Sequence, residues 1–221
     1  MGQQILMKKL IIPKLAPEID RNNLDVVRDY LQRQPAQKIN VINWDDYPYC
    51  PEVFFRMMYD DEAFYFHFDV NEKYIRARET MNNGFVWLDS CLEFFLSPEG
   101  NDIYYNLEMN CIGTKLLGLR KPGAEPELAN DEILSKIRCW SSLGNTPFEE
   151  RKGEFVWHLI AIVPFSSYWK HPVKPVSGLK MKGNFYKCGD ELSEPHYVSW
   201  NKIDTETPSF HQPRFFGELE F

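Results

Sequence analysis

The sequence predicts an all-β protein, an antiparallel β-sandwich or open barrel with a few short helices. Many short runs of the chain alternate apolar and polar residues with a period of two, which is typical of half-buried strands. Gly and Pro turns separate these runs at short intervals, as they do in sandwiches and barrels. No composition break or internal repeat divides the 221 residues, so we expect a single domain.

The strand candidates follow one another along most of the chain. In residues 63–70 the rings of Phe64, Phe66 and Phe68 share one face. A short acidic turn separates this run from residues 53–59, so the two runs are predicted to form an antiparallel hairpin. The remaining candidates are residues 38–44, 88–96, 103–111, 137–143, 155–163, 180–188, 196–200 and 215–221.

Helical patterns are confined to short segments. Residues 23–33 have the longest one, and residues 132–136 and 165–169 are shorter candidates. Pro164 ends the strand before the last of these, because proline has no amide hydrogen to donate to a sheet. Residues 120–131, RKPGAEPELAND, are expected to form an exposed loop.

The hairpin of residues 88–96 and 103–111 carries the most chemical information. Pairing Leu96 with Ile103 around the turn at residues 97–102 sets the expected register. Apolar side chains then fill one face, and polar side chains gather on the other. This register pairs Glu93 with Asn106, Cys91 with Glu108, Asp89 with Asn110 and Phe95 with Tyr104.

The polar face of this hairpin has two interpretations. Its members are Asp89, Glu93, Asn106, Glu108 and Asn110. Antiparallel sheets often leave one face solvated, and this face can be of that kind. It can instead line a groove for a polar ligand, because like charges on paired strands are unfavourable unless something separates or neutralises them. Trp87, just before the strand, favours a sugar, whose hydroxyls bond amides and carboxylates and whose C–H faces stack on rings.

The net charge and the lengths of the apolar runs argue against two classes of partner. The formal net charge is −7, whereas proteins that bind nucleic acids carry clustered Lys and Arg. No apolar run approaches the roughly 20 residues of a membrane-spanning helix. We therefore expect neither a nucleic-acid nor a membrane partner.

The cysteines do not form a recognisable framework. There are five of them, scattered and without a C-x-x-C pair, which fits neither a set of disulfides nor a zinc site. We expect all of them to be free thiols with structural roles. The first ten residues show no signal peptide, so the expected compartment is the cytoplasm, or the periplasm or exterior if a leader was removed.

Several segments together resemble carbohydrate-binding module family 9, and most closely the stand-alone bacterial proteins related to it. They are DSCLEFFLSP (89–98), YYNLEMNCIGT (104–114), NFYKCGD (184–190), EPHYVSW (194–200) and PSFHQPRFFGELEF (208–221). The resemblance covers residues 38–221 and leaves residues 1–37 as an N-terminal extension packed on that domain. It implies an immunoglobulin- or jelly-roll-like, DOMON-like β-sandwich and non-catalytic binding of a carbohydrate.

The resemblance also implies a shallow cleft in which a sugar lies between two aromatic rings. Trp87 stands six residues before Glu93, which is the family's spacing between one ring and its carboxylate. The neighbouring strand positions supply the implied polar contacts. They are Asp89, Asn106, Glu108 and Asn110.

The second ring of the cleft is implied near Asn184. In the family it follows an Asn on a later strand and is expected to be Trp, whereas Phe185 and Tyr186 stand here. The implied ligand is a glucan or xylan, such as cellulose or xylan fragments, bound in the course of polysaccharide catabolism. Family members bind structural calcium, and we expect no other cofactor.

Two alternatives remain at this point. Glu93 and Glu108 lie on neighbouring strands, and glycoside hydrolysis needs a pair of carboxyl groups roughly 5–10 Å apart. The second alternative is a DOMON-like haem module, for which His67 and Met109 would be axial ligands. We rank the binding protein above both.

Overall fold

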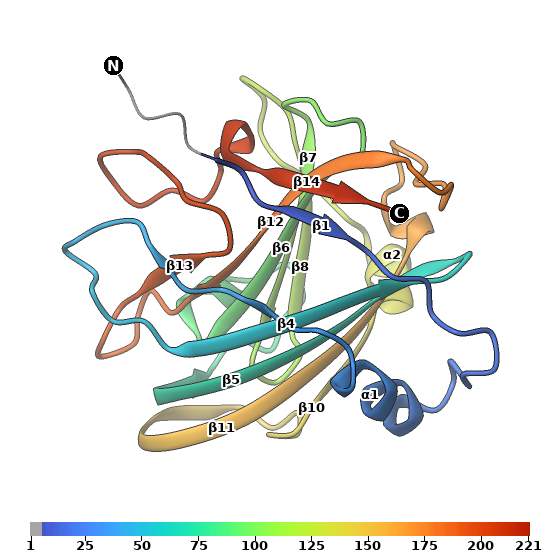
Figure 1. The fold of residues 1–221 in the computed structure, drawn as a ribbon. Helices are drawn as coiled ribbons and strands as arrows, with labels where there is room; N and C mark the ends of the chain where they lie inside the picture. Colours follow the sequence, from blue (N-terminus) through green and yellow to red (C-terminus); the bar gives the residue numbers. More distant parts are fainter. Residues whose placement is uncertain (1–5) are drawn as a thin grey trace.

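The protein is a sandwich of two β-sheets packed face to face (Figure 1). This computed structural model describes residues 6–221, so residues 1–5 of the expected extension lie outside the described residues. One sheet has nine strands and the other has five. The prediction of an all-β sandwich is confirmed.

The nine-stranded sheet has β6 and β12 at its centre and is built largely from the middle and end of the chain. Its order is β1-β14-β12-β6-β7-β8-β9, and β13 and β3 extend it from β12. The strands are β1 (Lys9–Ile11), β3 (Val41–Ile42), β6 (Cys91–Ser97), β7 (Tyr104–Asn110), β8 (Lys115–Arg120), β9 (Glu127–Leu128), β12 (Lys180–Cys188), β13 (Tyr197–Ser199) and β14 (Gly217–Glu220).

The five-stranded sheet crosses in front of the larger one in Figure 1. Its order is β10-β11-β5-β4-β2, with every neighbouring pair antiparallel. The strands are β2 (Gln37–Lys38), β4 (Glu52–Tyr59), β5 (Ala63–Ala77), β10 (Arg138–Ser141) and β11 (Phe148–Pro164).

The helices are few and short, as expected. They are α1 (Leu24–Gln32), α2 (Asp131–Lys136) and the single 3₁₀ turns η1 (Val86–Leu88), η2 (Phe165–Ser167) and η3 (Pro213–Phe215). Asn23 caps α1, because its side-chain oxygen accepts hydrogen bonds from the amides of Asp25 and Val26. Val27 and Leu31 then pack this helix against β4 and β5. No helix in residues 6–221 is long and apolar enough to span a membrane.

The N-terminal residues take part in both sheets. β1 pairs in parallel with β14, and β2 pairs with β4. Residues 38–44, predicted as one strand, are divided, because β2 joins the small sheet whereas β3 pairs with β13 in the large one. β8 was not predicted, since its run KLLGLR has no regular alternation.

The central hairpin has a different register from the predicted one. Glu93 pairs with Glu108, Phe95 with Asn106 and Cys91 with Asn110, so the predicted pairing of Leu96 with Ile103 is wrong by two residues. A shift of two residues keeps every side chain on its face, because side chains alternate along a strand. The polar face therefore contains the predicted residues, but those on β6 and β7 pair with different residues on the neighbouring strand from the predicted ones.

The main core lies between the sheets. Phe64, Phe66 and Phe68 of β5 lie in it, as their alternation predicts, together with Phe94 of β6 and Phe185 of β12. The ring of Phe185 stacks on those of Phe55 and Phe94, with centroid separations of 3.7 and 4.7 Å.

A second apolar cluster covers the outer face of the nine-stranded sheet. Phe95 and Tyr186 point outward from β6 and β12, and Phe210 and Phe216 of the C-terminal segment pack over them. This segment leaves part of the outer face open, and the candidate site lies there.

Candidate functional site

A hollow of about 250 Å³ opens on the outer face of the nine-stranded sheet. Its floor comes from β6, β7 and β12, and its walls come from η1, the turn after β12 and the C-terminal segment. The lining residues are Trp87, Glu93, Glu108, Arg120, Cys188, Asp190, Tyr197, Pro208, Ser209, Phe210 and His211. Three of them, Trp87, Glu93 and Glu108, were predicted as site residues.

Two carboxylates form the floor of the hollow. Glu93 and Glu108 are direct partners across β6 and β7, and their side chains are 3% and 4% exposed. Burial, followed by the charge of Glu108, raises the pKa of Glu93 well above its usual value. Burial likewise raises the pKa of Glu108 to about 7. Glu108 therefore gains or loses its proton near neutral pH.

In each of the two floor carboxylates, one oxygen accepts a hydrogen bond from a protein side chain. Oε1 of Glu93 accepts a hydrogen bond from the thiol of Cys188 at 3.1 Å. Oε1 of Glu108 accepts one from the amide of Asn106 at 2.8 Å, whereas its Oε2 is buried without a partner. A buried oxygen without a donor is unfavourable by about 1–3 kcal/mol, so it is a strong acceptor for a ligand hydroxyl.

Asn106 lies below the floor rather than in the hollow. Its side chain is fully buried and joins two lining residues, because its oxygen accepts from Nε of Arg120 at 3.1 Å while its amide donates to Glu108. A Cβ atom at Gly118 would stand 2.7 Å from that oxygen. Gly118 thus leaves the space in which Asn106 orients Glu108.

Trp87 stands on one wall of the hollow. Its ring is half-buried and meets the exposed ring of Phe85 edge-on, at a centroid distance of 5.2 Å. The carbonyl of Trp87 accepts a hydrogen bond from the amide of Asp190 at 3.2 Å. This bond holds the turn after β12 beside η1. Burial raises the pKa of the Asp190 carboxyl to about 6.

Asp89 and Asn110 fix this wall from behind and do not line the hollow. Asp89 is 1% exposed and accepts from Arg76, from the amides of residues 78 and 79, and from Asn110. Arg76 also donates to the carbonyl of Leu88 in η1 and to Glu191 beside Asp190. Both oxygens of the Asp89 carboxylate therefore accept hydrogen bonds from the protein itself.

Another wall comes from residues 208–211, which were not predicted as site residues. The hydroxyl of Tyr186 donates to the carbonyl of Phe210, and the two rings stack at 4.2 Å. The hydroxyl of Tyr104 contacts Nδ1 of His211 at 3.0 Å. Tyr197 of β13 completes this wall. Tyr186 is one of the predicted site residues. The others lie in the segments YYNLEMNCIGT, EPHYVSW and PSFHQPRFFGELEF, whose resemblance to the family was the available signal.

The residues expected as the second ring lie elsewhere. Phe185 is in the main core, on the inner face of β12, and Tyr186 lies beneath Phe210. Asn184 is fully buried and binds the backbone of Asn201 in both directions. Besides Trp87, the Tyr and Phe rings that line the hollow are those of Tyr197 and Phe210.

Two side-chain groups among residues 6–221 have the spacing of metal ligands. They are His67, Asp69 and His158, and Cys91, Glu93 and Cys188. Calcium prefers ligand sets made of oxygen atoms, and each group contains nitrogen or sulfur. Neither group fits the expected calcium. His67 and Met109 also do not face a common haem site, because Met109 is in the main core and His67 is on the outer face of β5.

Comparisons with known proteins agree with this architecture. The profile described as carbohydrate-binding family 9 matches residues 25–221. A candidate carbohydrate-binding protein from Bacteroides uniformis is 42% identical, with a TM-score of 0.91 over 98% of this chain and 100% of that one. No curated protein matches the chain.

More distant solved structures share the fold. A family 9 module from Caldicellulosiruptor kristjanssonii in complex with glucose has a TM-score of 0.64 at 15% identity, over 96% of this chain and 95% of that one. The complex of such a module with cellotriose gives 0.63 at 15% identity, over 96% and 93%.

Proposed function

Because the chain belongs to carbohydrate-binding family 9, we propose that the hollow bounded by Trp87 binds a sugar without altering it. The main support for this proposal is that the indole of Trp87 and the buried carboxylates of Glu93 and Glu108 line the same hollow. Oε2 of Glu108 accepts no hydrogen bond from the protein. A pyranose ring matches both, since its C–H face stacks on an aromatic ring and its hydroxyls donate to carboxylates.

The charges of the hollow favour a neutral ligand. Glu93, Glu108 and Asp190 line it beside the single cation Arg120. An anion would meet repulsion from these carboxylates, whereas a polyol donates hydrogen bonds to them. Neutral oligosaccharides are thus the expected class.

Among neutral sugars, we expect fragments of β-glucans or xylans. Family 9 modules of the same fold are known in complex with glucose and with cellotriose. A hollow of about 250 Å³ suits one or two sugar rings rather than a long chain. The protein would then act in polysaccharide catabolism by holding a terminal fragment.

Replacing Trp87 by alanine tests this function. The substitution removes the stacking surface, so the affinity for cellotriose or xylotriose should fall at least about tenfold, which corresponds to 1.4 kcal/mol. Isothermal titration calorimetry measures this effect. Trp169→Ala is the matched control, because Trp169 is also half-buried but packs against Tyr105 away from the hollow. Unchanged binding in Trp87→Ala, or equal losses in both variants, would contradict the proposal.

A hydrolase is the second candidate, and one observation favours it. Glu93 and Glu108 are direct cross-strand partners, and both have raised pKa values, as the acid of a glycosidase has. Release of reducing sugar from oligosaccharides, lost in Glu93→Gln, would establish it. Binding without turnover would support the non-catalytic function.

A further inference from the structure

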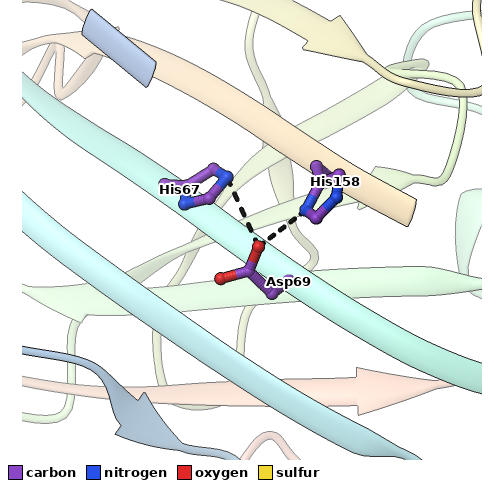
Figure 2. A group of neighbouring side chains, drawn as sticks. All are labelled: His67, Asp69 and His158. Atoms are coloured by element: carbon purple, nitrogen blue, oxygen red, sulfur yellow. Dashed lines mark hydrogen bonds and ion pairs between the residues drawn. The ribbon is translucent and has the colours of Figure 1, made fainter. Parts of the chain in front are cut away.

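The outer face of the five-stranded sheet carries a cluster that is separate from the sugar hollow. His67 and Asp69 lie two residues apart on β5, and His158 of β11 is the direct cross-strand partner of Asp69. All three side chains therefore project from the same face. Figure 2 shows the Asp69 carboxylate between the two imidazole rings.

His67 has no hydrogen-bond partner. Its side chain is 0% exposed, and neither Nδ1 nor Nε2 is paired. Its Nε2 faces Oδ1 of Asp69 at 3.6 Å. A buried polar ring without partners is unfavourable unless a ligand satisfies it.

The ligand atoms of His67 and Asp69 lie at a distance that suits a small metal ion, whereas those of Asp69 and His158 are closer together. Zn²⁺ binds His nitrogen and carboxylate oxygen at about 2.0–2.2 Å, so tetrahedral ligand atoms are roughly 3.3–3.5 Å apart. The separation from His67 to Asp69 is 3.6 Å. Nδ1 of His158 lies 2.6 Å from the same oxygen, so this ring would move outward by less than about 1 Å.

The surroundings of the cluster allow an ion to enter. The side chains of His158 and Asp69 are 32% and 25% exposed, which opens the cluster to solvent on one side. Arg56 binds the other oxygen of Asp69, Oδ2, and so keeps Oδ1 directed at the imidazoles. Such an outer partner commonly orients a metal-binding carboxylate.

We propose that His67, Asp69 and His158 form a binding site for a divalent transition-metal ion, with Zn²⁺ as the expected occupant and water as the fourth ligand. Two imidazoles and one carboxylate are ligands that zinc takes in proteins, with one position open to water. The Cys91, Glu93 and Cys188 group is a weaker candidate, because the Cys188 thiol already donates to Glu93 and burial raises the pKa of both cysteines. The zinc site is independent of the proposed sugar binding.

Calorimetric titration of the tag-free protein with ZnCl₂ tests the proposal. One ion per chain is expected, with an affinity that falls at least about tenfold in His158→Gln. His158 is chosen because it is partly exposed, so its replacement does not disturb the core. His171→Gln, which changes a half-buried histidine bound to Tyr105, is the matched control and should bind zinc as the wild type does.

A second variant distinguishes the two clusters. Cys188→Ser should leave zinc binding unchanged, and the Co²⁺-substituted protein should lack the thiolate-to-metal absorption that cysteine ligands produce. No binding up to millimolar zinc, or binding that is lost in Cys188→Ser and kept in His158→Gln, would overturn the proposal. Cellotriose titration of His158→Gln should match the wild type, so a failure of the zinc site is separable from a failure of the sugar site.

Discussion

Replacing Lys187 by methionine should lower the free energy of unfolding by about 3–5 kcal/mol. Lys187 of β12 points between the sheets and is 0% exposed. Its ammonium forms an ion pair with Oε2 of Glu72 of β5 at 2.8 Å, and it donates hydrogen bonds to the carbonyl of Cys188 and to Nε2 of His196, each at 2.9 Å. Its charge is thus paired inside the protein.

The large effect comes from the carboxylate that the substitution leaves behind. Glu72 is 1% exposed, and Nε1 of Trp157 donates to its Oε1 at 2.8 Å. Without Lys187, the buried carboxylate of Glu72 loses its ion-pair partner, and Nε2 of the buried His196 imidazole lies 3.9 Å from its Oε2. Removing one member of a buried pair is strongly unfavourable for this reason, whereas replacing both members is often close to neutral.

Urea unfolding at neutral pH measures this prediction. The double variant Lys187→Met with Glu72→Gln should recover most of the lost stability, because no charge is left buried. Lys136→Met is the matched control, since Lys136 pairs with Glu132 on the surface of α2 and such pairs contribute about 0.3–0.5 kcal/mol. A loss in Lys187→Met as small as that of the control would show that the buried pair does not stabilise the sandwich.

Replacing Glu108 by glutamine should make the protein more stable above pH 7 and weaken its binding of sugar. The folded protein raises the pKa of Glu108 from 4.5 to about 7, mainly by burial. Between these pH values the folded state holds a proton that the unfolded chain has lost. The free energy of unfolding of the wild type therefore falls as pH rises through this window, by roughly 3 kcal/mol from this group.

Glutamine removes the titration while keeping the shape of the side chain. Its oxygen can still accept from Asn106, and no buried charge forms at high pH. Urea unfolding at pH 5 and pH 8 should show a smaller loss of stability in Glu108→Gln than in the wild type. Glu206→Gln, at an exposed position, is the control and should behave as the wild type does. A variant that is less stable than the wild type at pH 8 would contradict the assignment of a destabilising charge to the floor.

Local periodicity predicts which face each strand residue occupies. The alternation that placed Phe64, Phe66 and Phe68 in the core continues through Val70 to Glu72 on β5, and both Val70 and Glu72 are buried. On β12 the same period places Lys187 on the inner face with Phe185. Charged residues at core positions thus indicate a buried pair. Which carboxylate meets Lys187 depends on how two sheets pack, and no local pattern contains that information.

The walls of the hollow show where local reasoning ends. Side chains alternate along β12, so Phe185 and Tyr186 cannot both face a cleft, and Phe185 is the one in the core. Residues 208–211 also line the hollow, and they fold back over the sheet through the contacts of Phe210 with Tyr186. Only this non-local packing determines which rings line the hollow.

The hairpin register illustrates the same limit on a smaller scale. The composition of the polar face follows from the period of two, so Glu93 and Glu108 were correctly placed together. Their level along the strands depends on the turn at residues 97–102, which shifts the pairing by two residues. As a result Glu93 faces Glu108 rather than Asn106. Burial and then the charge of Glu108 raise the pKa of Glu93, whereas burial raises the pKa of Glu108.

A crystal structure with cellotriose tests the central claim most directly. We expect a sugar ring packed on the indole of Trp87, with hydroxyls donating to Glu93 and to the free Oε2 of Glu108. Tyr197 or Phe210 should close the other side of the ring. Cellotriose bound instead in the hollow between Phe54 and Val156 on the five-stranded sheet, with the Trp87 hollow left to water, would contradict the account.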